Sequence, residues 1–126
     1  MAVMADLAAI VGMISGMVRR HRIDLTNEKQ AQAQIEGLLT DHGLTFTREM
    51  RLSPGDIPDF FLPDPGLALE VKLRAPSKTG VFRQLQRYAK DERVKGVLLI
   101  SNTAMGLPAT IEGKPAWFVS LGQAWL

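Results

Sequence analysis

Two stretches of the chain place apolar residues at the spacing of an α-helix. In the segment 25–43 these residues form one stripe, and Thr26 or Asn27 can cap the start of the helix. In the segment 80–92 apolar residues again share one side, while basic residues lie elsewhere. The pattern therefore predicts two amphipathic helices, each with one side free for solvent or a ligand.

Five shorter segments have the pattern of β-strands. Apolar and polar residues alternate in the segment 44–52, and a tight turn at 63–66 joins two further runs as a hairpin. One later run is almost continuously apolar, as in a strand covered on both faces. The predicted strands are 44–52, 59–62, 67–73, 94–102 and 116–121. This order of helices and strands predicts an α/β fold, with a mixed sheet flanked by helices.

The first 18 residues are apolar except for Asp6 and Ser15, and basic residues follow them. A secretory signal carries its positive charge in front, and a membrane span needs about 20 apolar residues, so we expect neither. We expect a helix packed on the domain or on a second subunit. Because it is apolar nearly all round, burial by a partner chain is favoured, which predicts a homo-oligomer. We assign 1–22 to this helix and 23–126 to the main domain.

Composition narrows the chemistry. The 126 residues suffice for one domain with its own core, and none of them is cysteine. This excludes thiolate catalysis and zinc–thiolate sites and fits a reducing compartment, so we expect a cytoplasmic protein. The net charge is only +2, but basic residues cluster at 19–22 and 83–95, either as solvated surface or as a site for an acidic partner. Phosphate-loop and nucleophile-elbow motifs do not occur.

The strand 67–73 carries Glu70 and Lys72 two positions apart, so both side chains point to the same face. A half-exposed strand with an ion pair on its wet side is one interpretation. The hairpin favours another, because it brings Asp59 next to Glu70, and two convergent carboxylates repel each other unless a cation lies between them. Mg²⁺ or Mn²⁺ accepts such oxygen ligands. Lys72 would then stand beside the metal, where it can orient water or stabilise negative charge.

These residues resemble a known signature. Pro58-Asp59 followed by Glu70-Val71-Lys72 is similar to the motif of the PD-(D/E)XK, or restriction-endonuclease-like, nucleases. The resemblance implies that Asp59 and Glu70 bind one or two Mg²⁺ ions, with the Val71 carbonyl as a further ligand. It also implies that Lys72 positions the water that attacks phosphorus.

The resemblance extends beyond the motif to about residues 26–102, because the predicted order α-β-β-β-α-β is that of the family's core. It implies a restriction-endonuclease-like core behind an N-terminal apolar helix. Members commonly add an acidic residue from the first core helix that binds the metal directly or through water, and Glu28 is the match, since it points toward the sheet side. Glu36 lies about 80° off that direction and is the poorer candidate. An acid that only stabilises the helix N-terminus is the alternative interpretation of Glu28.

The second helix carries Gln84 and Tyr88 four residues apart, on one face. A Gln-x-x-x-Tyr pattern resembles the motif of the exonuclease-like branch of the family, which implies that Gln84 helps to hold the active site and that the helix lies near DNA. A surface glutamine and a half-buried tyrosine are the alternative. The residues expected to contact DNA are Lys78, Arg83, Arg87, Tyr88 and Lys90.

The sequence thus predicts a Mg²⁺-dependent nuclease that cleaves DNA, with Glu28, Asp59, Glu70, Lys72 and Gln84 as catalytic residues. We expect recognition of DNA structure or ends rather than of a long sequence, and such a small nuclease fits a phage or mobile element. Two alternatives stay open. One is a DNA-binding or assembly module that keeps the nuclease fold without catalysis, and the other is a protein tethered to a membrane surface by residues 1–18.

Overall fold

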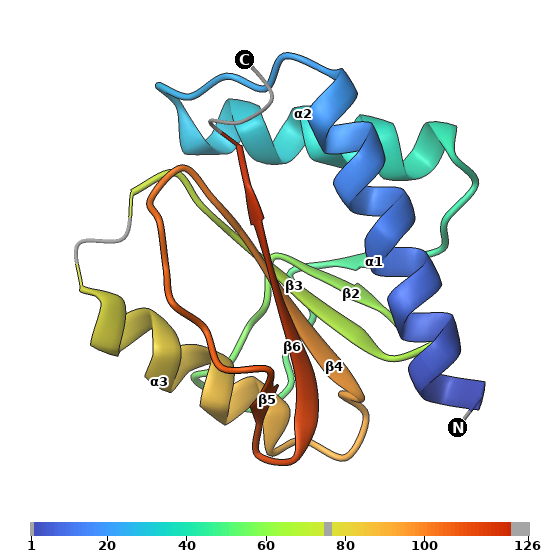
Figure 1. Ribbon diagram of the computed structural model, residues 1–126, viewed down its shortest axis with the longest axis vertical. Coiled ribbons are helices and arrows are strands. Elements are labelled where there is room, and N and C mark those ends of the chain that lie inside the picture. Colours follow the sequence, from blue (N-terminus) through green and yellow to red (C-terminus); the bar gives the residue numbers. More distant parts are fainter. Residues whose placement is uncertain (1, 75–76, 122–126) are drawn as a thin grey trace.

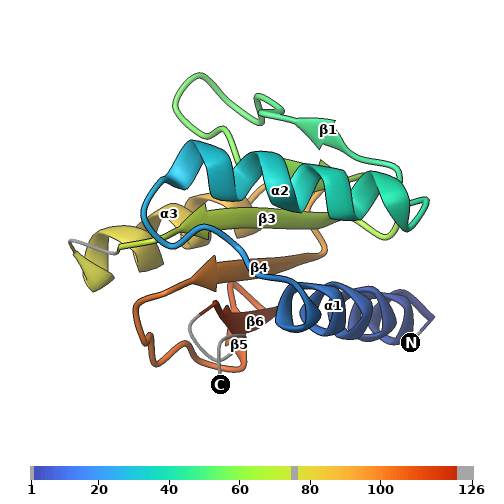
Figure 2. The ribbon, with the colours of Figure 1, turned by 90° about the horizontal axis from the view of Figure 1, so that it is seen from above.

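The structure is a computed structural model that describes residues 2–74 and 77–121. Within these residues it is an α/β fold in which three helices flank one mixed sheet (Figure 1, Figure 2). In chain order the elements are α1 (Ala2–Arg20), α2 (Glu28–Asp41), β1 (Thr47–Arg48), β2 (Phe60–Leu62), β3 (Leu67–Lys72), α3 (Lys78–Ala89), β4 (Gly96–Ser101), β5 (Thr110–Ile111) and β6 (Lys114–Ser120).

The described strands form the sheet in the order β1-β2-β3-β4-β6-β5. The central strands β3, β4 and β6 are parallel, and the two sheet edges add antiparallel hairpins. Helix α3 connects β3 to β4. Because the carboxyl ends of parallel strands meet at one edge, Lys72 at the end of β3 lies beside Ser101 at the end of β4. The loops that follow these two strands therefore leave the sheet together.

Two hydrophobic cores lie on the two faces of the sheet. Helices α1 and α2 pack on one face, against Leu69 and Val71 of β3 among others (Figure 1). Helix α3 packs on the opposite face, where the core includes Ala68. Since successive side chains of a strand alternate between faces, Glu70 belongs to the α3 face. Glu70 is 3% exposed and lies beneath a helix, so the interpretation of this strand face as an exposed ion pair is wrong for Glu70.

Both amphipathic helices are confirmed, with capped starts. The Asn27 side chain accepts a hydrogen bond from the Gln30 N–H at 3.0 Å, so α2 begins at Glu28. The Ser77 hydroxyl accepts one from the Gly80 N–H at 3.0 Å, so α3 begins at Lys78, two residues before the predicted start. Capping thereby fixes Glu28 and Lys78 at the first positions of their helices.

The strand predicted over 44–52 is wrong in extent, because only Thr47 and Arg48 pair with β2. Glu49 has a φ of 50°, and its left-handed backbone ends the strand. Phe46 packs on the core beneath α1 and α2, whereas Met50 packs on the core beneath α3. The chain here passes around the edge of the sheet from one face to the other, and this path produces the alternation that suggests a longer strand.

The hairpin strands and the two later strands are confirmed as β2, β3, β4 and β6. The short strand β5 was not predicted. It pairs with β6 through a turn in which Glu112 and Gly113 have φ values of 52° and 73°. A strand of two residues is too short to show the alternation of apolar and polar residues from which strands are predicted.

Helix α1 packs on its own domain. Its buried residues belong to the core that it shares with α2 and the sheet: Leu7, Val11, Ile14, Met17 and Val18. Much of the apolar surface that favoured a partner chain is therefore covered within the chain, although Met13 is 43% exposed. Homo-oligomerisation stays a prediction. In the described part of the chain, no helix has the length and apolar character to cross a membrane.

Candidate active site

The β2–β3 hairpin brings Asp59 and Glu70 together. Phe60 pairs with Leu69 in the antiparallel register, so the next residues outward are Asp59 and Glu70. The Asp59 N–H lies 3.3 Å from Glu70 Oε1. The turn at 63–66 thus places Asp59 opposite Glu70, as the sequence predicts.

Asp59 is fixed by the strand that carries the rest of the motif. Its Oδ2 accepts a hydrogen bond of 2.7 Å from the Val71 N–H. This contact holds the carboxylate at the open side of β3, beyond the end of β2. The N–H and C=O of one residue in an extended strand point to the same side, so the Val71 carbonyl also faces away from β4, toward the Asp59 side.

Glu70 has a partner for each carboxylate oxygen. Its Oε1 accepts a hydrogen bond of 2.9 Å from the Tyr88 hydroxyl on α3, which also lies 3.2 Å from the Ile57 carbonyl oxygen. Its Oε2 lies 3.4 Å from Lys72 Nζ. The pair predicted within β3 is therefore real, and α3 supplies the contact that orients the buried acid.

The two acids are electrostatically strained. Burial and, after it, the neighbouring charge of Asp59 together raise the pKa of Glu70 to about 7, against the opposing effect of Lys72. Burial likewise raises the pKa of Asp59 to about 6, opposed by the Val71 hydrogen bond and Lys72 and assisted by Glu28. Two carboxyl groups that resist ionisation side by side are a pair that a bound cation would relieve.

This strain predicts the pH dependence of stability in the presence of EDTA. The folded-state pKa values of both acids are raised, so the folded protein binds protons more tightly than the unfolded chain. Stability is therefore greatest at acidic pH and is lost as pH rises through about 6 and 7. Between pH 5 and pH 8 we expect a loss of roughly 3 kcal/mol, or about 10 °C in Tm, measured by thermal unfolding.

The matched control is the double variant Asp59→Asn/Glu70→Gln, which keeps the shapes of both side chains but removes their titration. Its Tm should vary much less over the same pH range. An equally steep fall in the double variant would contradict the assignment of the strain to these two acids.

Glu28 and Glu36, the two acids of α2 considered for the site, have different partners. Glu28 Oε1 accepts a hydrogen bond of 3.1 Å from the Leu73 N–H, just past the end of β3. Glu36 instead forms a 2.8 Å ion pair with Arg48 of β1. Glu28 therefore points at the end of β3, and Glu36 connects α2 to the edge of the sheet.

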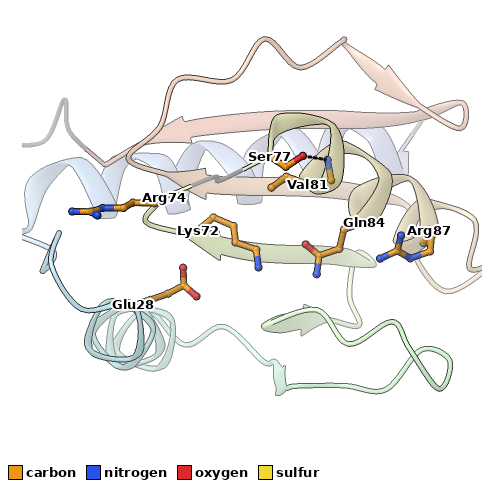
Figure 3. A pocket seen from close by; sticks show the side chains of 8 residues that line it. Glu28, Lys72, Arg74, Ser77, Val81, Gln84 and Arg87 are labelled. Carbon is orange, nitrogen blue, oxygen red and sulfur yellow. Dashed lines mark hydrogen bonds between the residues drawn. The ribbon is translucent and has the colours of Figure 1, made fainter.

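A cleft of about 400 Å³ opens between α2 and α3, over the end of β3. Figure 3 shows the Glu28 carboxylate, the Lys72 amine and the Gln84 amide directed toward its interior from three different elements. The residues that line it are Glu28, Lys72, Arg74, Ser77, Gly80, Val81, Gln84 and Arg87. Three cations and one acid give the cleft a net positive lining, which suits a phosphate-bearing ligand.

The residues of α3 that were predicted to contact DNA lie in different environments. Arg87 lines the cleft but forms a 2.8 Å ion pair with Asp56, and Lys90 lies with it in a neighbouring hollow. Lys78 and Arg83 are exposed, and neither lines the cleft. The assignment of Tyr88 to DNA contact is corrected, because its side chain is 1% exposed and its hydroxyl is bound to Glu70.

Two polar residues of the cleft, Arg74 and Ser77, are not among the site residues predicted from the sequence. Arg74 continues the alternation of Glu70 and Lys72, so the period of two places it on their face. That signal was available. Ser77 was hidden by the late start predicted for α3, although a serine before a helical run is an ordinary capping signal. Ser77 lies at the start of α3, across the cleft from Glu28, whereas the Arg74 side chain extends away from Lys72 beyond the end of β3 (Figure 3).

Within the described residues, no three acidic or histidine side chains gather closely enough to form a metal cage. The oxygen donors that the structure brings together are the Asp59 and Glu70 carboxylates and the adjacent backbone of β3. No protein-family model, curated protein or solved structure matches the chain. The geometry of the residues themselves therefore carries the functional argument.

Proposed function

We propose that this protein is a metal-dependent nuclease that hydrolyses phosphodiester bonds in DNA. The observation that carries the proposal is the adjacency of Asp59 and Glu70 beside Lys72, which itself lines the positively charged cleft. The order α2, β1, β2, β3, α3, β4 also agrees with a restriction-endonuclease-like core. Both features are those of the PD-(D/E)XK nucleases.

The proposed metal site consists of Asp59, Glu70 and the Val71 carbonyl. The donors fit Mg²⁺, with Mn²⁺ as a substitute, because a hard cation prefers oxygen ligands and would relieve the raised pKa values of the two acids. When bound, the ion supplies Lewis-acid activation of the phosphate and of water. Tyr88 holds Glu70 in place from beneath through its hydroxyl.

The remaining cleft residues act on the substrate directly. Lys72 Nζ, held beside Glu70, orients the water for in-line attack and stabilises charge that develops on the phosphate. Gln84 assists from α3, and Glu28 assists from the opposite wall (Figure 3). Arg74 and Arg87 lie where they would contact backbone phosphates, a sequence-independent and salt-sensitive interaction.

The test is a cleavage panel with Mg²⁺ or Mn²⁺ and with EDTA. Linear, circular, single-stranded, flapped and four-way DNA are incubated with the protein, and products are resolved on gels. We expect metal-dependent hydrolysis of at least one substrate and none in EDTA. Binding of DNA by folded protein without cleavage of any substrate would contradict the enzyme and favour a non-catalytic DNA-binding module.

A further inference from the structure

A second pocket lies on the other side of the first turn of α3. It has a volume of about 270 Å³. Its floor and walls come from α3 and from the loop between β4 and β5, which descends along α3 in Figure 1. The lining residues are Lys78, Thr79, Phe82, Met105, Gly106, Leu107 and Pro108. The pocket is thus mainly apolar, with one aromatic ring inside and one lysine at its rim.

This pocket and the cleft share the first turn of α3. Ser77, Gly80 and Val81 line the cleft, while Lys78, Thr79 and Phe82 line the second pocket, so the two hollows lie on different faces of this turn. The loop that closes the pocket leaves the sheet after Ser101, which pairs with Lys72. A chain-like ligand with a phosphate in the cleft would reach Phe82 by passing over the start of α3.

We propose that this pocket binds an unpaired nucleobase of the DNA strand whose phosphate occupies the cleft. A flat aromatic ring system matches the apolar lining, and Phe82 offers a ring for contact with it. Lys78 at the rim complements the flanking phosphate. A base held in a Watson–Crick pair is not available to such a pocket. The inference rests on the proposed function and specifies its substrate as single-stranded, flapped or frayed DNA.

The occupancy of the pocket by a base is tested by binding in EDTA, where metal-dependent cleavage is absent. Fluorescence anisotropy compares a labelled oligothymidylate with an abasic strand of the same length, which keeps every phosphate and removes the bases. Because contact with an aromatic side chain contributes about 1–3 kcal/mol per base, we expect the abasic strand to bind roughly tenfold more weakly. A duplex with a single-stranded tail should likewise bind more tightly than a blunt duplex.

Three variants assign that difference to the pocket. Phe82→Ala removes the ring, and Leu107→Glu places a carboxylate in the pocket without altering the helix. Both of these variants should bind the thymidylate and abasic strands equally. Phe118→Ala is the matched control, because Phe118 is partly buried in the same hydrophobic core but does not line the pocket. It should retain the tenfold difference, and thermal unfolding checks that all three variants fold.

Equal binding of thymidylate and abasic strands by the wild-type protein would overturn the proposal. So would tighter binding of the equivalent RNA, which would assign the pocket to another nucleic acid. The result is separable from the nuclease assignment, since it is read without metal. Base-dependent binding without cleavage in Mg²⁺ would sustain the pocket and refute the enzyme, whereas cleavage without base dependence would do the reverse.

Discussion

Lys72→Ala is expected to lower the rate of metal-dependent DNA cleavage by about 10²- to 10³-fold, the cost of removing one preorganised electrostatic group from an active site. Two effects act together. The cleft loses the amine that lies 3.4 Å from Glu70 Oε2 and faces the substrate. The pKa of Glu70 also rises, because the charge of Lys72 opposes the effect of burial, so less of the carboxylate is ionised. Single-turnover cleavage of the best substrate measures the loss.

The fold should tolerate this change, because the Lys72 side chain lies at the end of β3 and is 28% exposed. Lys29→Ala is the matched control. Lys29 follows Glu28 on α2, is exposed and does not line the cleft, so its removal costs one positive charge outside the site. An unchanged rate for Lys72→Ala, or an equal loss for Lys29→Ala, would remove Lys72 from the mechanism.

The hairpin that carries the site was predictable from sequence because every interaction that forms it is local. A tight turn between two apolar runs sets the register, and the register alone places Asp59 opposite Glu70. The direction of Glu28 was predictable for the same kind of reason, since helical periodicity is fixed once Asn27 sets the start. Period and turn chemistry thus suffice for three of the proposed site residues.

The support beneath the site was not predictable, because it depends on contacts between distant segments. Helical periodicity places Tyr88 on the same face of α3 as Gln84. It does not show that the partner of the Tyr88 hydroxyl is Glu70 rather than DNA. The pairing of Arg48 with Glu36 similarly joins α2 to β1, with the Arg48 guanidinium 4.7 Å from the centre of the Phe60 ring. Only the packing of both helices on the sheet determines these partners.

The pattern over 44–52 shows how a real periodicity can mislead. Its apolar residues are partly buried, as alternation predicts, but they pack against opposite cores as the chain turns around the sheet edge. The following loop is then held on α3 by the Arg87–Asp56 ion pair and by the Tyr88 hydroxyl near the Ile57 carbonyl. Hydrophobic pattern records that a residue is buried, but not which core buries it.

Asp59→Asn is expected to lower cleavage by about 10³-fold and, in EDTA, to raise Tm by several degrees. The asparagine keeps an oxygen that can accept the hydrogen bond from the Val71 N–H, while the repulsion that raises the pKa of Glu70 disappears. Mg²⁺ should stabilise the wild-type protein, by about 1.4 kcal/mol at ten times the dissociation constant. Mg²⁺ should stabilise the Asp59→Asn variant very little. Differential scanning fluorimetry with and without Mg²⁺ measures both effects.

Asp64→Asn provides the comparison within the same hairpin, because Asp64 is exposed in the turn at the opposite end of β2 from Asp59. It should leave cleavage, Tm and the Mg²⁺ response unchanged. For Asp59→Asn we expect cleavage to fall while Tm in EDTA rises, and this combination distinguishes a metal ligand from a structural residue. Neutralising a carboxylate that only supports the fold lowers the stability of the protein. Neutralising a carboxylate that is held for a cation instead raises the stability and removes the stabilisation by the ion. A lower Tm for Asp59→Asn with an intact Mg²⁺ response would therefore assign Asp59 to the fold and refute the metal site.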